Sequence, residues 1–508
     1  MDSNVPSASQ WVKVLDQSRC IGCHACTTAC KSENVVPLGV TRTYVKSVDV
    51  GVFPNARRAF QVTRCNQCED APCVSACPTR AMYRRPDGIV DFDKDLCIGC
   101  KACMAACPYD AIFINPEDHS AEKCNFCAHR LDIGLEPACV TVCPTQAILV
   151  GDLNDPTSKV AQIVEREPIT VRRPEKETRP KVFYKGARQT TLDPLAARRP
   201  EAGLLAWATQ PDRGRSVPGG SPGRPNSSAA ALLSYDVPHE APWGWRVSLY
   251  TWTKSIAAGS LLVTVLLLLL GRLAWGSPLA RWAGPATALL LLGVTGLLLI
   301  WDLKHPFRCY LIFTEHHWRS WLVRGAAIIT AYGVVCAAAL AGSFAGWIVF
   351  RYLVAGLAIP LALATACYTA YLFAQAKARD LWQSPLLPPH LLVQAVLAGS
   401  AVMLPFALGL GSPGAAATLR LGVAGAALAH LLLVFGETTL THGTAHARLA
   451  VHELVRGRFA GFFWVSTLLL LVALAAPWIG VAASPAALVG LLAYEHAYVR
   501  AGQSVPLA

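Results

Sequence analysis

The cysteines limit what this chain can fold into more than any other feature of the sequence. The chain has 508 residues and 19 cysteines, of which 16 lie between positions 20 and 143. Those 16 form four groups: Cys20, Cys23, Cys26 and Cys30; Cys65, Cys68, Cys73 and Cys77; Cys97, Cys100, Cys103 and Cys107; and Cys124, Cys127, Cys139 and Cys143. The remaining Cys309, Cys336 and Cys367 lack ligand spacing, so we expect them to be structural.

The spacing within the four groups indicates iron–sulfur clusters of the [4Fe–4S] type. The first and third groups read C-x2-C-x2-C-x3-C, and a proline follows the last cysteine of the second, third and fourth groups. Such a loop can ligate three corners of a cubane cluster, while the more distant fourth cysteine ligates the other cluster of a two-cluster module. Sixteen thiolates therefore predict four clusters.

Zinc and disulfides are the competing interpretations of these cysteines. Zinc ribbons use two C-x2-C pairs, which leaves the third cysteine and the Cys-Pro ending without a role. Disulfides form in oxidising compartments, and the topology below argues against export of this region. We therefore favour clusters.

The second half of the chain predicts membrane-spanning helices. Only 15% of all residues are charged, against roughly 25% in soluble domains. Long stretches lack Asp, Glu, Lys and Arg, and a bilayer needs about 20 such residues per helix. One span each is expected in 255–271, 282–301, 325–350, 352–376, 381–419 and around 421–436, and two in 459–494, which makes eight.

The distribution of Lys and Arg predicts the orientation in the membrane. With eight spans, nine of these residues lie in the loops on the side of the N-terminus and four on the opposite side. The positive-inside rule then places both termini and the cysteine-rich region in the cytoplasm. Residues 1–10 agree, because they contain neither an apolar signal core nor twin arginines.

These patterns divide the chain into three parts. We expect an iron–sulfur domain over residues 1–190 and an all-α integral membrane domain over residues 243–508. Between them, residues 191–242 are rich in Pro, Gly and Arg, which predicts a flexible linker.

The cysteine-rich part resembles a known family. The order of the four groups, the longer spacing in the fourth and residues 179–184 are similar to the four-cluster iron–sulfur subunits of molybdopterin oxidoreductases, of the dimethyl sulfoxide reductase and polysulfide reductase type. The resemblance covers residues 10–190 and implies an α+β ferredoxin-like head with two bis-[4Fe–4S] modules. Because Cys73 is present, it implies four cubanes rather than one three-iron cluster.

The resemblance also implies a swapped pairing, in which the first group shares clusters with the fourth and the second with the third. The implied ligand sets are Cys20, Cys23, Cys26 and Cys143; Cys30, Cys124, Cys127 and Cys139; Cys65, Cys68, Cys73 and Cys107; and Cys77, Cys97, Cys100 and Cys103.

The membrane part resembles a second family. Residues 250–259, 301–308 and 318–326 are similar to the polysulfide reductase membrane subunits, eight-helix proteins that bind a quinone beside an iron–sulfur partner. The resemblance covers residues 240–500 and implies two four-helix bundles in a bacterial inner membrane, with ubiquinone or menaquinone as ligand. The whole chain therefore resembles a fusion of an electron-transfer subunit with a membrane anchor.

A quinone site needs hydrogen-bond donors and groups that carry protons. Ionisable residues inside spans are unfavourable there and are functional candidates by default. The candidates for quinone binding or proton relay are Tyr250, Trp252, Lys254, Asp302, His305 and Glu437. Structural roles stay open: Lys254 could snorkel, Asp302 could pair with Arg324, Trp252 could belong to an interfacial belt, and Glu437 could be a cap.

We therefore predict an electron-transfer and membrane-anchor subunit of a respiratory oxidoreductase, with four clusters between a molybdopterin-containing catalytic subunit and a quinone. The sequence contains no dinucleotide fingerprint, P-loop or nucleophile elbow, so the substrate reaction belongs to the partner. A redox-driven proton-translocating module and a hydrogenase partner remain alternatives. Nucleic acid is not an expected partner, because membrane topology explains the net charge of +12.

Overall fold

The computed structural model describes residues 9–198, 221, 227 and 229–508. The chain folds into two compact units. The head unit comprises Met1–Pro242, Ala376–Ala378 and Val505–Ala508, and the membrane unit comprises Trp243–Gln375 and Arg379–Ser504. Most of the central part of the predicted linker lies outside the described residues, whereas its last residues, 229–242, belong to the head unit.

A four-stranded sheet in the head unit joins the strand before the first cysteine group to strands that follow the last one. Its order is β8 (Ile148–Asp152), β1 (Trp11–Asp16), β10 (Val182–Lys185) and β9 (Ile169–Thr170). Strand β1 runs antiparallel to β8 and parallel to β10. Val12 and Val14 of β1 pack against Val160 and Ile163 of α6 (Lys159–Arg166), which covers one face.

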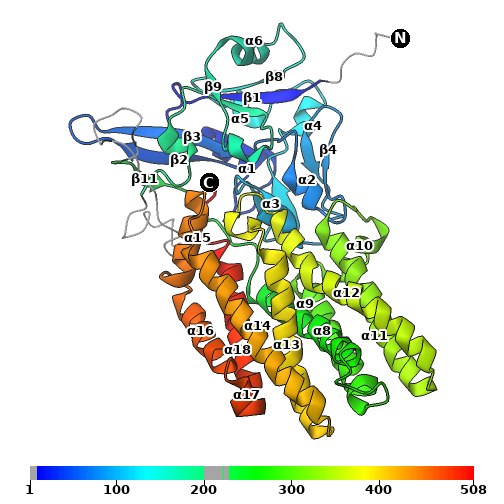
Figure 1. Ribbon diagram of the computed structural model, residues 1–508. Helices are drawn as coiled ribbons and strands as arrows, with labels where there is room; N and C mark the ends of the chain where they lie inside the picture. Colours follow the sequence, from blue (N-terminus) through cyan, green and yellow to red (C-terminus); the bar gives the residue numbers. More distant parts are fainter. Residues whose placement is uncertain (1–8, 199–220, 222–226, 228) are drawn as a thin grey trace. The chain divides into compact units, whose positions relative to one another are not determined.

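A second sheet contains the long hairpin of β2 (Thr43–Val50) and β3 (Arg57–Arg64), extended by β11 (Leu232–Tyr235). Figure 1 shows this hairpin projecting from the rest of the head unit. Val48, Val50 and Leu233 form its small apolar core. Strand β11 lies inside the segment that the sequence predicted to be a linker, and it is ordered because it completes this sheet.

Two short hairpins connect the remaining cysteine groups. One consists of β4 (Met82–Arg84) and β5 (Val90–Phe92), and the other of β6 (Ile112–Ile114) and β7 (Ala121–Lys123). The short helices of the head are α1 (Ala25–Glu33), α2 (Pro72–Ala76), α3 (Ala102–Ala106), α4 (Ala128–Leu131), α5 (Ala138–Thr141) and α7 (Gln189–Leu192). Every hairpin therefore connects one cysteine group with the next.

The membrane unit is all-helical. Its long helices are α8 (Trp245–Leu269), α9 (Gly284–Asp302), α11 (Trp321–Ala345), α12 (Ile348–Ala374), α13 (Leu387–Gly409), α14 (Pro413–Thr439), α16 (Ala460–Ala473) and α18 (Ala483–Ala501). Shorter helices are α10 (Leu311–Thr314), α15 (Ala445–Val455) and α17 (Ala476–Ile479). Figure 1 shows the long helices side by side.

The described part of the chain contains seven helices long and apolar enough to cross a membrane. Helices α15 and α16 pass the same test together but are bent by 67°, so they would make an eighth span if they cross as one. The prediction of an all-helical membrane domain is confirmed, and the number of spans is seven or eight. Helices α8, α9, α11 and α12 pack together, as do α13, α14, α16 and α18.

Two glycines allow α8 and α13 to touch through their backbones. A Cβ atom added to Gly259 would lie 1.8 Å from the carbonyl oxygen of Ala395, and one added to Gly399 would lie 2.2 Å from the carbonyl carbon of Gly259. No side chain fits in such a space, so both positions require glycine.

We expect Gly259→Ala to separate α8 from α13 and to lower the free energy of unfolding by about 1–3 kcal/mol, the usual effect of overpacking. Thermal unfolding of the detergent-solubilised protein measures the change. Gly293→Ala on α9 is the control, because a Cβ there meets nothing within 4 Å. Equal melting temperatures for both variants would contradict the close contact.

Candidate functional site

The strand pairing in the head brings the first and last cysteine groups together. Strand β1 ends four residues before Cys20, and β8 begins five residues after Cys143. Because Leu15 pairs with Ile148, the two groups emerge from the same end of the sheet. The Cys20 thiol has Cys143 and Cys23 as electrostatic neighbours, and Cys26 has Cys20 and Cys23.

The other cysteines also gather in sets drawn from two groups. Cys30 has Cys124, Cys127 and Cys139 as electrostatic neighbours. Cys65, Cys68 and Cys107 surround Cys73, and Cys77, Cys97 and Cys100 surround Cys103. A cavity of about 20 Å³ is lined by all four members of this last set. Most of these neighbours correspond to the swapped pairing, and neighbouring sets also approach one another, since Cys26 has Cys139 and Cys65 has Cys124 as a neighbour. Ligation itself stays a prediction.

The geometry of these sets suits a cluster better than a single metal ion or disulfides. All 19 cysteines are free thiols. Within the described ranges, no three His, Cys, Asp or Glu residues converge closely enough to hold one metal ion. Four thiolates on one zinc ion would each lie about 2.3 Å from it. A cubane binds its four thiolates through four separate irons.

The cysteine loops turn backbone N–H groups toward the sulfurs. Left-handed conformations occur within the loops, at Gly22 (φ 71°), His24 (φ 60°), Gly99 (φ 67°) and Lys101 (φ 62°). Backbone N–H groups donate to sulfur in three of the sets, from Met82 to Cys77 (3.4 Å), Ala121 to Cys97 (3.3 Å), Ala147 to Cys143 (3.2 Å) and Gln67 to Cys65 (3.5 Å). Such bonds stabilise thiolates, the form that binds iron.

Two buried cations lie beside the Cys139 thiol. Nη1 of Arg64 lies 3.1 Å and Nζ of Lys13 lies 3.8 Å from the Cys139 sulfur. Burial raises the pKa of Cys139, but the charges of Arg64 and Lys13 outweigh burial and lower it to about 7. The remaining members Cys30 and Cys127 have pKa values raised by burial.

A buried histidine, His239, forms ion pairs near the end of the segment 229–242. Nδ1 of His239 lies 2.8 Å from Oδ2 of Asp110, and its Nε2 lies 3.2 Å from Oδ1 of Asp236. Burial lowers the pKa of His239, but the two carboxylates outweigh it and raise the pKa to about 9. The imidazolium therefore ties residues 236–239 to the loop that follows the third cysteine group.

The raised pKa of His239 predicts a pH-dependent attachment of residues 229–242. An unfolded histidine has a pKa of about 6.5. The ion pairs should therefore contribute about 3 kcal/mol below that pH, and the contribution should be lost as the pH rises through about 9. Hydrogen exchange of this segment, compared between the wild type and His239→Gln, measures it. A wild-type advantage that does not change with pH would contradict the imidazolium.

The membrane unit contains a buried polar site around Lys254 on α8. Its Nζ donates to the carbonyl oxygen of Ala366 (2.9 Å) and to Oγ1 of Thr369 (2.7 Å) on α12. Oε2 of Glu495 on α18 accepts from Oγ1 of Thr251, one turn before Lys254. Lys254 is completely buried, so it does not snorkel to the interface.

A second polar cluster surrounds Glu437 on α14. Its carboxylate accepts hydrogen bonds from the hydroxyls of Tyr494 (3.2 Å) and Tyr498 (3.4 Å) on α18. Nε2 of His390 on α13 and Nδ1 of His430 on α14 are 2.9 Å apart. The Tyr494 ring contacts both imidazoles, at centroid distances of 5.3 and 4.7 Å.

The structure brings Tyr250, Lys254 and Asp302 near one another and places the other predicted quinone candidates elsewhere. Tyr250 is buried one turn before Lys254, and Asp302, the last residue of α9, is its electrostatic neighbour. Trp252 has a different partner: its indole N–H donates to the carbonyl oxygen of Leu488 on α18 at 2.9 Å. His305 lies beyond α9, before the short turn at Pro306–Arg308.

The prediction by residue type missed His390, Tyr494 and Thr369 at these two polar clusters. Their only signal is a polar side chain within a span. His390 follows two prolines, so the sequence marks it as a helix start and not as part of a site.

A head built around cysteine sets and an all-helical membrane unit define a membrane-bound iron–sulfur protein. Three family models match the chain: a 4Fe-4S binding domain over residues 11–32, a 4Fe-4S dicluster domain over residues 57–153, and polysulphide reductase, NrfD, over residues 235–505. The last match covers more than half of the chain, so the chain belongs to the polysulphide reductase NrfD family.

The head is similar to subunits of reductases. It is 43% identical over 197 residues to a subunit of the tetrathionate reductase of Salmonella typhimurium, covering 37% of this chain and 77% of the relative. It is 45% identical over 179 residues to one of the chains of the polysulfide reductase of Wolinella succinogenes, covering 35% and 94%. It is 51% identical over 150 residues to the thiosulfate reductase electron transfer subunit PhsB of Salmonella typhi, covering 29% and 78%. The chain is therefore a fusion of an electron-transfer part with a membrane-anchor part.

Proposed function

We propose that this chain is the electron-transfer and membrane-anchor subunit of a respiratory oxidoreductase complex. It passes electrons between a catalytic partner subunit and a quinone held by the membrane unit. The observation that carries the proposal is the presence, in one chain, of four cysteine sets and an NrfD-family membrane unit with buried polar groups. The names of the relatives, all parts of reductases, support it.

Each cysteine set holds one [4Fe–4S] cluster in this proposal, arranged in two bis-cluster modules. Such clusters supply one-electron transfer when bound. The chain supplies the thiolates, the backbone N–H donors and a mostly buried environment for them. The first set lies nearest to solvent, because Cys23 is exposed and Cys20 and Cys143 are half-buried.

The catalytic partner in this proposal is a molybdopterin enzyme. Relatives of the head are named as parts of tetrathionate, polysulfide and thiosulfate reductases, which act on sulfur compounds. The chain itself has no recognisable substrate-binding motif. The Lys and Arg distribution supports a bacterial inner membrane with the head in the cytoplasm.

The site around Lys254 suits a quinone. A quinone takes up two electrons and two protons, so its site needs a donor for a carbonyl oxygen and a nearby proton carrier. The Lys254 ammonium and the Thr369 hydroxyl are donors, and Glu495 on the facing helix can carry a proton. The Glu495 carboxylate is buried, and the Ser255 and Thr251 hydroxyls are its polar neighbours.

The arrangement of the polar groups favours quinone chemistry over proton translocation. His390 lies near the start of α13 and Glu437 near the end of α14, while Lys254 lies in the first half of α8 and Glu495 in the second half of α18. Successive spans run in opposite directions, so these groups share one half of the membrane unit. The half of the membrane unit away from these groups consists mostly of Ala, Leu, Val and Gly, so we do not propose a transmembrane proton path.

Iron analysis of the protein purified from membranes tests the cysteine sets. We expect about sixteen irons per chain, about twelve in a Cys100→Ser variant, and a molybdenum-containing partner that co-purifies. Cys309→Ser is the matched control and should keep all its iron, because Cys309 belongs to no set. Zinc in place of iron, or equal iron in both variants, would disprove the assignment.

Exchange of electrons with a quinol analogue tests the membrane site. We expect Lys254→Met and Glu495→Gln to lower turnover roughly 100-fold, the usual effect of removing a general acid or base, while the iron content stays unchanged. Arg246→Gln, at a half-buried residue that stacks on the Trp301 ring and lies on the same helix as Lys254, should keep wild-type turnover. Full turnover in both site variants would place the quinone elsewhere.

A further inference from the structure

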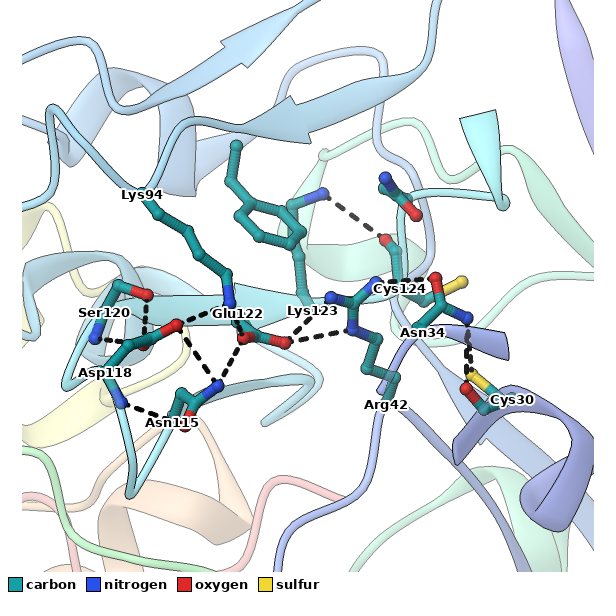
Figure 2. A network of polar contacts seen from close by, with 12 residues as sticks. Cys30, Asn34, Arg42, Lys94, Asn115, Asp118, Ser120, Glu122, Lys123 and Cys124 are labelled. Carbon is teal, nitrogen blue, oxygen red and sulfur yellow. Dashed lines mark hydrogen bonds and ion pairs between the residues drawn. The ribbon is translucent and has the colours of Figure 1, made fainter. Parts of the chain in front are cut away.

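One cysteine set receives side-chain donors on several sides. Asn34 lies at the end of α1, four residues after Cys30. Its Nδ2 lies 3.7 Å from the sulfur of Cys30, 3.7 Å from the sulfur of Cys127 and 3.1 Å from the carbonyl oxygen of Cys30. One amide group therefore faces two thiols of the set Cys30, Cys124, Cys127 and Cys139. Figure 2 shows its contacts with Cys30.

The orientation of this amide is fixed by a chain of charged residues. Nη1 of Arg42 donates to Oδ1 of Asn34 at 2.9 Å. Since a guanidinium can only donate, the amide oxygen must face Arg42 and the NH2 group must face the sulfurs. Arg42 in turn forms a buried ion pair with Oε2 of Glu122 at 2.8 Å. The other oxygen of Glu122 contacts Asn115 and Lys94 (Figure 2).

Two cations approach the same set through Cys139. Arg64 (1% exposed) and Lys13 (0% exposed) contact its sulfur at 3.1 and 3.8 Å. Lys13 also lies 4.2 Å from the centre of the Phe126 ring. Among the described residues, no carboxylate forms an ion pair with either cation, although a buried unpaired charge is strongly unfavourable. The thiolates of the set are therefore their counter-charge.

Donors and cations at the sulfurs change how readily such a set accepts an electron. Reduction adds one negative charge to a thiolate-ligated cluster, and hydrogen bonds to the sulfurs and nearby positive charge stabilise the more negative state. Three side chains here act on three of the four sulfurs from a buried environment, where electrostatic interactions are stronger than in water.

We propose that Asn34, Lys13 and Arg64 raise the reduction potential of the cluster held by Cys30, Cys124, Cys127 and Cys139, with Arg42 as a positioning residue that orients the Asn34 amide. This cluster is therefore reduced more readily than it would be without these side chains. The inference rests on the ligand set of the proposed function and adds the residues that set its potential.

A redox titration of the full chain in detergent, followed by electron paramagnetic resonance, tests the proposal. Arg64→Met and Lys13→Met should each lower the reduction equilibrium constant of this cluster at least tenfold, which is about 59 mV for one electron. Arg64→Met should also shift the cluster of Cys20, Cys23, Cys26 and Cys143 by a smaller amount, because Arg64 is an electrostatic neighbour of Cys26. The other two clusters should stay unchanged in both variants. Asn34→Asp should lower the same constant as Lys13→Met, because it places a carboxylate beside Cys30 and Cys127. Arg42→Met should give a smaller shift in the same direction.

Two controls separate tuning from packing. Arg64→Lys keeps the charge and should remain near the wild-type potential. Arg58→Gln removes an exposed arginine, paired with Asp49, that contacts no cysteine in the described contacts, and it should change no potential.

Unchanged potentials in Lys13→Met and Asn34→Asp, or an equal shift of all four clusters, would overturn the proposal. A potential for Arg64→Lys as low as that of Arg64→Met would remove Arg64 from it and assign that residue to packing. If Arg64→Met loses iron, the potentials of Lys13→Met and Asn34→Asp decide whether the proposal holds. Failure of the ligand set itself would appear separately, as wild-type protein with fewer than four reducible clusters.

Discussion

The antiparallel pairing of β1 with β8 is the contact on which the head depends. Between them lie all four cysteine groups, and the pairing returns the chain to its beginning after more than 120 residues. Closing so long a loop is entropically unfavourable. The burial of Val12, Val14 and Ile148 offsets that loss, since these apolar side chains leave water only when the strands meet.

The alternation of side chains along β1 gives the two faces of this strand separate roles. Val12 and Val14 face α6, while Lys13 and Leu15 face the cysteines. Side chains on a strand point to opposite faces in turn, so the residue that contacts Cys139 follows from the strand that closes the fold. Arg64 reaches the same sulfur from the last position of β3, directly before Cys65. The strands that position the cysteine groups also deliver the charges beside them.

Local patterns in the sequence predicted the helices and the cysteine-rich head. They could not predict the contacts between residues that are distant in the sequence. Cysteine spacing and charge-free stretches are local patterns, and the ferredoxin-type head and the apolar helices follow from them. Strand β11 has no such signal, because Leu232–Tyr235 becomes a strand only through β2. Asn34 has the composition of an ordinary helix end, and its role depends on Arg42 and on Cys127, which is 93 residues away. Glu437 was predicted from its place in a span, but Tyr494 and Tyr498 come from another helix.

Both units contain buried cations, and these cations share one physical requirement. Lys13 and Arg64 in the head, and Lys254 in the membrane unit, are all removed from water. A charge in such a place is stable only beside polar or negative groups, and losing the partner of a buried charge typically destabilises a protein by about 3–5 kcal/mol. Lys254 has the Ala366 carbonyl and the Thr369 hydroxyl, both supplied by the chain. Lys13 and Arg64 have only thiols as acidic contacts, and thiols become a lasting negative partner when they bind metal. We therefore expect folding of the head to depend on cluster binding at the Cys139 set, whereas the chain itself supplies polar partners for Lys254.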